Sequence, residues 1–361
     1  MAFSAVAPRR DAADPTSLAD PTDLADPADP AESAEPADLG DPVLADGREG
    51  PAWDVRAAVR MAFPQPARQA HDAAYAARLD LYMRDMLREH GLDASCDDRD
   101  WAGWSYSEMA TALLQRAVPA HESVDLLVFA YAIPDVNPGR NMAALLSGNC
   151  PGKPLAFGLS DQGVAAPFTA LRLIRQYART AGLRRALLLV VEQAALPYRA
   201  SDNVAIPAGH TGVALLLGDC GHGPNSASPL RLGPIITRAG IREDAVEQEL
   251  KTLCAQHTAS TVILGSALSH WARHAGALAS GGECRVRVAQ AAQPLTGLWW
   301  ELAAEYDARA DSPRSIALCD YDPVQGCLCL AVLASHSACG HSHVRVTTRK
   351  GSAPISATAA Q

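Results

Sequence analysis

Residues 153–182, KPLAFGLSDQGVAAPFTALRLIRQYARTAG, predict a buried strand that leads through a tight turn directly into a helix. A turn of this kind presents side chains at a helix N-terminus, where partial positive charge favours an ionised nucleophile. The side chains available there are Ser160 and Asp161, which suit an acyl-accepting hydroxyl and a general base. We favour a structural role for both side chains, because Ser and Asp satisfy free N–H groups in turns and at helix starts.

A second candidate nucleophile is Cys150, in the segment SGNCPGKP. The nearby Lys153 would lower the pKa of an exposed thiol and favour the reactive thiolate. Cysteine is among the residues most often buried, so we favour a structural thiol. Cys327 and Cys329 alternate on one face of an apolar strand pattern, which predicts core packing.

Metal and cofactor sites are not indicated by the sequence. The nine cysteines are scattered without a C-x-x-C pair, so we expect most of them to be reduced and buried. The segment SHSACGHSHVRV groups His336, Cys339, His341 and His343, but their spacing fits the usual zinc sites poorly. A P-loop, a dinucleotide fingerprint and an H-E-x-x-H stretch are all lacking. We therefore expect neither a bound metal nor a cofactor.

Charge is distributed unevenly along the chain. Residues 1–50 hold 12 of the 40 acidic and 3 of the 31 basic side chains, which leaves 28 of each for the rest. A neutral body lacks the cationic face that nucleic-acid binding requires. The Asp-Pro-rich residues 1–50 contain few large apolar side chains, so we expect a disordered, solubilising tail. Docking to a basic partner is the alternative role for this tail.

Hydrophobic residues make up 48% of the 361 residues, which is enough to bury a large core. They form no run of 18 or more, and the opening MAFSAVAPRR lacks the order of a signal peptide. We expect a cytoplasmic protein without membrane contact.

Apolar segments and helix patterns alternate from Trp53 onward. Strands are expected within residues 53–63, 124–132, 154–160, 184–194, 211–219, 230–240, 260–268, 284–290, 315–322 and 327–335. Helices are expected within residues 70–91, 106–118, 141–148, 165–182, 243–257 and 297–310. Several strand patterns are continuously apolar, which indicates a sheet covered on both faces and hence an α/β fold.

The order of these elements suggests an internal duplication. The Gly/Pro/Ser-rich residues 218–228 lie between two α/β units in which strands and helices follow in a similar order. We expect an N-terminal half at residues 51–218, a compact C-terminal half at residues 229–335, and a flexible tail at residues 336–361.

The run from Val124 to Leu217 resembles the N-terminal half of type III β-ketoacyl-ACP synthases, members of the thiolase-like superfamily. The resemblance rests on FTALRLIRQYARTAGLRRALLLVVE, where the family has a helix, a Gly and a strand ending in an acidic residue, here Glu192. The segment HTGVALLLGD is similar to the family's Gly-rich strand entry, and weaker similarity extends over residues 53–335. The resemblance implies a thiolase-like fold, in which two α/β halves form a five-layer sandwich, and acyl-CoA or acyl carrier protein as partner.

The resemblance also implies an active-site cysteine, histidine and asparagine, and none of the three is present. The cysteine position falls on Val164, or on Gly163 when it is counted from the preceding strand. The asparagine position, before the helix pattern GLWWEL, falls on Pro294. Neither Val164 nor Pro294 carries the chemistry of the family residue.

The histidine position falls on Gly265 or Ser266, in the segment VILGSAL. His270 and His274 follow closely and are alternatives for this role. With Ser266 at this position, all three active-site residues are substituted.

Two functions are consistent with these substitutions. The first is a pseudoenzyme-like subunit without cysteine-dependent condensation, which pairs with an active synthase in polyketide, fatty-acyl or other secondary-metabolite biosynthesis. The alternative is an acyltransferase that moves an acyl group from CoA or carrier protein to an oxygen or nitrogen acceptor, with Asp161 as base. The resemblance implies dimerisation through the strand in residues 184–194, whose apolar edge would pair with a second copy or with an active ketosynthase.

Overall fold

The computed structural model describes residues 53–64, 73–89, 103–138, 141–196, 204–219, 230–257, 259–272, 284–308 and 315–335. All of them belong to one unit, Pro36–Gln361. The expected acidic tail, the expected C-terminal tail and most of the expected boundary segment lie outside these ranges. The expectations for those segments therefore stay predictions.

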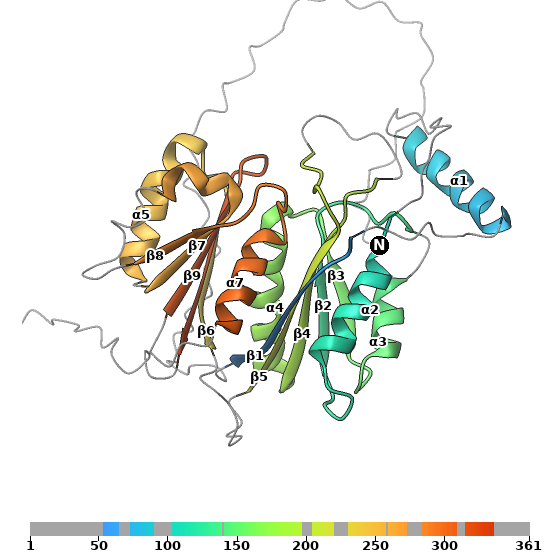
Figure 1. Ribbon diagram of the computed structural model, residues 1–361, viewed down its shortest axis with the longest axis horizontal. Helices are drawn as coiled ribbons and strands as arrows, with labels where there is room; N and C mark the ends of the chain where they lie inside the picture. Colours follow the sequence, from blue (N-terminus) through green and yellow to red (C-terminus); the bar gives the residue numbers. More distant parts are fainter. Residues whose placement is uncertain are drawn as a thin grey trace, which may run out of the picture. The chain divides into compact units, whose positions relative to one another are not determined.

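In the described part of the chain, ten strands form one mixed sheet in the order β3-β2-β4-β5-β1-β6-β10-β9-β7-β8 (Figure 1). The strands are β1 (Trp53–Ala62), β2 (Leu126–Ala130), β3 (Leu155–Leu159), β4 (Arg185–Glu192), β5 (Thr211–Asp219), β6 (Leu230–Arg238), β7 (Thr261–Leu264), β8 (Arg285–Val288), β9 (Ser315–Asp322) and β10 (Cys327–Ser335). Each lies within a segment that the apolar pattern predicts as a strand.

The helices also follow the predicted segments. They are α1 (Ala73–Arg88), α2 (Tyr106–Ala117), α3 (Met142–Asn149), α4 (Ala166–Ala181), α5 (Val246–Gln256) and α7 (Gly297–Asp307), with the short 3-10 helices η1 (Gly163–Ala165), η2 (Glu243–Ala245) and η3 (Ser266–Trp271). Helix α2 begins at a capping box, in which Ser105 and Glu108 each accept a backbone N–H of the other. Strand β7 is shorter than expected, because the chain turns into η3 after Leu264.

The two halves have the same topology. The orders β3-β2-β4-β5-β1 and β8-β7-β9-β10-β6 place corresponding strands in corresponding places. In each half the first two pairs are parallel and the last two are antiparallel. Only the residue pairs Asp54↔Arg231 and Val55↔Leu230 join β1 to β6, so the ten strands consist of an N-terminal sheet (β3-β2-β4-β5-β1) and a C-terminal sheet (β8-β7-β9-β10-β6) that meet at this junction. The expected duplication is therefore confirmed in the order and direction of the strands.

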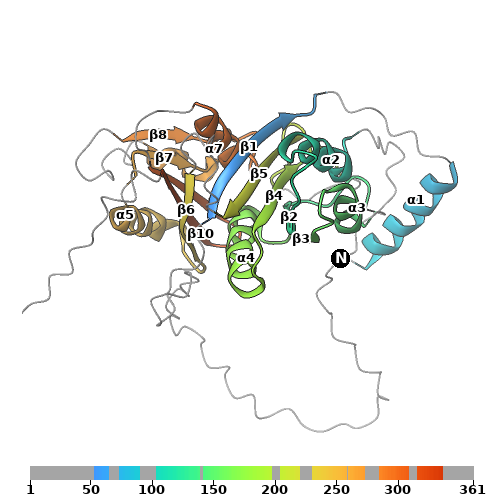
Figure 2. The same cartoon turned by 90° about the horizontal axis from the view of Figure 1, so that it is seen from below.

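The halves stack as the five-layer α/β sandwich that the resemblance implies. Figure 2 shows α4 and α7 between the two groups of strands, with α2 and α3 beyond one group and α5 beyond the other. Three buried clusters fill the spaces between the layers: one around α4 and α7, one under α2 and α3, and one under α5 and η3. Because both faces of each sheet are covered, strands such as β4 and β5 are apolar along almost their whole length.

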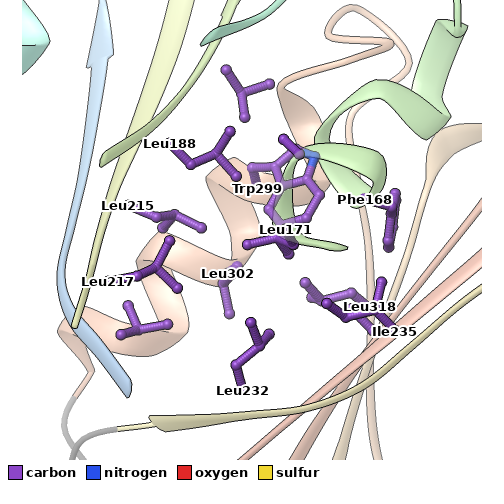
Figure 3. Close-up of a cluster of buried hydrophobic side chains, with 14 of the residues drawn as sticks. Phe168, Leu171, Leu188, Leu215, Leu217, Leu232, Ile235, Trp299, Leu302 and Leu318 are labelled. Carbon is purple, nitrogen blue, oxygen red and sulfur yellow. The ribbon is translucent and has the colours of Figure 1, made fainter. Parts of the chain in front are cut away.

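The central cluster is built around Trp299, in the first turn of α7. Its ring packs edge to face against Phe168, in the first turn of α4, with ring centroids 5.2 Å apart and an interplanar angle of 61°. Leu188 and Leu215 from one half and Leu318 from the other belong to the same cluster (Figure 3). Trp299 therefore lies in the core, and its contact with Phe168 brings the first turns of α4 and α7 together.

Two expectations about strand position are wrong. Strand β3 is not buried: it lies at the end of the sheet, and Leu155 is 53% exposed. Strand β4, which we expected to offer an edge for dimerisation, lies between β2 and β5 and is buried. An apolar segment of five to eight residues does not tell an edge strand from a central one, because length and composition are similar for both.

Candidate functional site

The turn between β3 and α4 forms a tight elbow. Asp161 and Gly163 both have positive φ values, 61° and 47°, which reverse the chain within a few residues. Aspartate and glycine both tolerate this left-handed conformation. Val164 lies in η1, directly before α4, and its side chain is half-buried. The elbow thus places Val164 directly before helix α4.

A carboxylate from the other half of the molecule lies against this elbow. Asp322, at the end of β9, accepts the Val164 N–H on Oδ2 at 3.4 Å. Its Oδ1 accepts the N–H groups of Val324 and Gln325, each at 3.0 Å. A Cβ atom on Gly163 would lie only 1.7 Å from Asp322 Oδ2, so this close approach requires glycine.

Ser160 and Asp161 contact each other rather than the helix start. The Ser160 hydroxyl donates to Asp161 Oδ2 at 2.8 Å, and the Asp161 side chain is exposed. No side chain of the N-cap residues of η1 and α4 caps these helices. The structural role expected for Ser160 and Asp161 is therefore wrong, because Asp322 satisfies the elbow N–H in their place. Their catalytic role stays a prediction.

A second carboxyl, that of Asp320, lies against Gly265, one of the two positions predicted to correspond to the family's histidine. Gly265 follows β7, and a Cβ atom there would lie 1.7 Å from Asp320 Oδ1. Ser266 begins η3 and is half-buried. Burial raises the pKa of the Asp320 carboxyl well above its usual range, and the negative charge of Asp322 adds to this effect. Asp320 and Asp322 are two residues apart on β9 and so lie on the same face.

His270 does not contribute to this arrangement. It is exposed, and its ring contacts that of Trp271, with centroids 3.6 Å apart. Both side chains line a surface cavity of about 560 Å³ whose other walls are Arg242, Glu243, Asp244 and Glu247. Trp271 packs in the outer cluster under α5, whereas α4 packs in the central cluster. The other alternative, His274, lies outside the described residues.

The position aligned with the family's asparagine, Pro294, precedes a buried carboxyl network. Glu192, at the end of β4, accepts the N–H groups of Leu295 and Thr296 on Oε2, at 2.9 and 3.2 Å. Its Oε1 accepts the hydroxyls of Thr211, at 3.0 Å, and Thr296. Burial raises the pKa of Glu192, and these hydrogen bonds oppose that rise. The network fixes the start of α7 against the end of the N-terminal sheet.

Cys150, Cys327 and Cys329 are all buried in hydrophobic clusters. Cys150 is 3% exposed, and burial raises the pKa of its thiol to about 11, which disfavours a thiolate. The predicted structural role of Cys150 is confirmed. Cys327 and Cys329 lie in the central cluster with their sulfur atoms 3.9 Å apart, which confirms core packing.

Metal-ligating residues do not gather in the part of the chain that the structure describes, where no group of three or more His, Cys, Asp or Glu could hold an ion. The group of His336, Cys339, His341 and His343 lies outside that part. Among the described helices, none combines the length and apolar character needed to cross a bilayer.

Sequence reasoning missed Asp320 and Asp322. A signal for them is present in CDYDPVQGC, where two aspartates alternate at the end of an apolar strand pattern. Period-two spacing places both on one face of the strand, and aspartate is rarely buried unless it is paired or hydrogen-bonded. Their alignment with the elbow and with Gly265 depends on contacts between distant segments.

The strand order, the layers and the elbow match the thiolase-like fold that the resemblance implies. Among solved structures, Xanthomonas campestris OleA bound to cerulenin is similar over 78% of this chain and 98% of its own, with 14% identity and a TM-score of 0.54. The tetronic acid condensing enzyme AbyA1 is similar over 78% of this chain and 99% of its own, with 14% identity and a TM-score of 0.50. At this identity the likeness establishes the shared fold. No protein-family model and no curated protein sequence matches the chain.

A half-buried carboxyl, that of Asp135, lies at the start of α2, apart from the elbow. Asp135 Oδ1 accepts the N–H groups of Tyr106, at 3.2 Å, and Asn137, at 3.1 Å. Burial raises the pKa of Asp135 to about 7, and the charge of Glu108 contributes to the rise. The folded state therefore holds the Asp135 proton more tightly than the unfolded state does.

This pKa predicts a pH-dependent stability. Stability is fully present below the usual carboxyl pKa and is lost as the pH rises through about 7. Asp135→Asn keeps the acceptor oxygen but cannot ionise, so we expect it to remove about 1–2 kcal/mol of the loss between pH 5 and pH 8. Urea unfolding of both proteins at the two pH values measures the difference, with the exposed Asp85→Asn as control. Equal pH dependence in wild type and Asp135→Asn would contradict the expectation.

Proposed function

We propose that this chain is a thiolase-like subunit without cysteine-dependent condensation, and that it pairs with an active synthase in polyketide, fatty-acyl or other secondary-metabolite biosynthesis. The observation that carries the proposal is the elbow, which retains a tight turn into α4 but presents Val164, a side chain without a nucleophilic atom. Acyl-CoA or acyl carrier protein is the proposed acyl source. The assignment to a biosynthetic system that contains a condensing enzyme is supported by the fold, because AbyA1, a solved structure of similar fold, is a tetronic acid condensing enzyme.

The partner surface that we propose is the edge of β3. Among the described strands, β3 pairs only with β2, so one side of its backbone faces no other described strand. Leu155 is 53% exposed on this strand. An exposed edge with apolar side chains favours pairing with another strand. A second copy of the chain, or an active ketosynthase of the same fold, would extend the sheet there, in the cytoplasm.

The alternative function is acyl transfer to an oxygen or nitrogen acceptor. It is favoured by one observation: the hydroxyl of Ser160 and the exposed carboxylate of Asp161 are paired at 2.8 Å, in the elbow itself. A carboxylate in this place is able to accept a proton from an acceptor alcohol or amine.

Replacing Asp161 by asparagine separates the two functions. Asparagine also tolerates the positive φ at this position, so we expect the fold to be preserved. For a non-catalytic subunit, the purified chain gives no turnover with a panel of acyl-CoAs and acyl carrier proteins. The wild-type chain and the Asp161→Asn variant then have the same effect on the activity of a co-purified, cysteine-bearing synthase. Intact-protein mass spectrometry and a thiol-release assay follow acyl transfer, and thermal unfolding reports on folding.

The acyltransferase function predicts a different result for the isolated chain. Turnover by the isolated wild-type chain that falls about a hundredfold in a normally folded Asp161→Asn variant would establish the acyltransferase. Ser160→Ala is the matched variant, because it keeps the carboxylate and removes only its hydrogen-bond donor.

A further inference from the structure

We infer that the Asp322 carboxylate fills the space at the elbow and blocks acylation there; we call this carboxylate the plug. The elbow therefore lacks a nucleophile and is also obstructed by a side chain of the same protein. This inference rests on the proposed function, in which the elbow no longer forms an acyl-enzyme. It adds that restoring a cysteine at the elbow does not by itself restore acyl uptake.

The position of the carboxylate is the first argument. Asp322 Oδ2 lies 3.4 Å from the Val164 nitrogen and 1.7 Å from the point that a Cβ atom on Gly163 would occupy. A nucleophilic side chain at residue 163 therefore has no room for its Cβ atom, and Oδ2 takes the place at the Val164 N–H that the carbonyl oxygen of an acyl group would otherwise occupy. The backbone N–H at the start of a helix is also a donor that stabilises a developing oxyanion, and here it is bonded to a carboxylate.

The turn that carries the plug is held on both sides. On the elbow side, Gln325 Nε2 donates to the Asp161 carbonyl at 3.1 Å. On the other side, the Ile241 N–H donates to the Gly326 carbonyl at 2.8 Å, and the Tyr321 hydroxyl donates to the Ile241 carbonyl at 2.9 Å. With only 8% of Asp322 exposed, the carboxylate is part of the packed structure.

The negative charge of Asp322 also opposes acylation at the elbow. A carboxylate beside the elbow disfavours a thiolate there, because like charges repel at short range. The neighbouring Asp320 contributes no cation, and its buried carboxyl favours the neutral form. No described hydrogen bond or ion pair brings Arg, Lys or His to the Asp322 carboxylate. The plug therefore opposes both binding of an acyl group and ionisation of a thiol.

The test compares Val164→Cys alone with Val164→Cys combined with Asp322→Asn or Asp322→Ala. Alkylation of the introduced thiol by iodoacetamide is followed by peptide mapping, and acyl uptake from acetyl-CoA and octanoyl-CoA by intact mass. We expect slow alkylation and no acyl adduct for Val164→Cys. Removing the charge with Asp322→Asn should raise the alkylation rate about tenfold, the thiolate gain for one pKa unit. Asp322→Ala, which removes the side chain, should in addition allow the introduced thiol to take up an acyl group.

Asp322→Asn and Asp320→Asn also serve as controls. Asp322→Asn retains the acceptor for Val324 and Gln325, so it decides the question if Asp322→Ala fails to fold. Asp320→Asn in the Val164→Cys background removes the adjacent carboxyl, which faces Gly265, and should leave alkylation within about twofold of the parent. Equal alkylation with and without the Asp322 charge would overturn the plug. Turnover by the unmodified chain would instead overturn the proposed function.

Discussion

Replacing Trp299 by alanine is expected to lower the free energy of unfolding by about 3–5 kcal/mol. The side chain is 1% exposed and lies in the central layer, where α4 and α7 meet between the two sheets (Figure 3). Its removal leaves a cavity and also ends the edge-to-face contact with Phe168. Packing on both sides limits how far the surroundings collapse into this space, so we expect a cost in the upper part of the range.

Urea unfolding at 25 °C, followed by circular dichroism, measures this loss. Trp300→Ala is the matched control: its ring is half-buried beneath Arg60, whose guanidinium lies 5.3 Å from the ring centroid. We expect about 1 kcal/mol for the control. Similar losses in both variants would contradict the central position of Trp299.

Replacing Glu192 by alanine is expected to cost about 3–5 kcal/mol, or to prevent folding. Glu192 accepts two backbone N–H groups before α7 and the hydroxyls of Thr211 and Thr296. The variant leaves these buried donors without their acceptor, and each unsatisfied donor costs about 1–3 kcal/mol. Because the network connects β4 and β5 to the start of α7, its loss weakens the contact between the halves.

Thr211→Val is the control for this network. It keeps the shape of the side chain and removes one hydroxyl, so we expect a loss of about 1 kcal/mol. Thermal and urea unfolding of both variants give the comparison. A Glu192→Ala variant as stable as Thr211→Val would show that the buried carboxylate does not hold α7 in place.

The sequence predicts the helices, the strands and the fold class because buried positions carry apolar side chains. Strands covered on both faces, such as β4 and β5, are continuously apolar, and the helix pattern of α4 marks an amphipathic helix. The position of each strand within the sheet is not recorded in this way. Strands β3 and β4 are both apolar, and only their partners decide which of them is the edge.

The site was predictable in part, for a related reason. The elbow is local, so its strand, turn and helix are visible within residues 153–182. The carboxylate that fills it comes from Asp322, 158 residues after Val164, and only the stacked halves bring the two together. Likewise, Gly265 is glycine because Asp320 lies against it, a reason that no local pattern contains.

The shared middle layer has a consequence for how the chain folds. Each half contributes one helix to this layer, α4 or α7, and a single cluster covers the inner faces of both sheets. Neither half can complete its core alone, so the two are expected to unfold together in one cooperative transition, although their topology repeats. The contacts that close the layer join residues far apart in sequence, which makes their formation slow relative to local structure. Until they form, a newly synthesised first half exposes the apolar inner face of its sheet and relies on the second half to cover it.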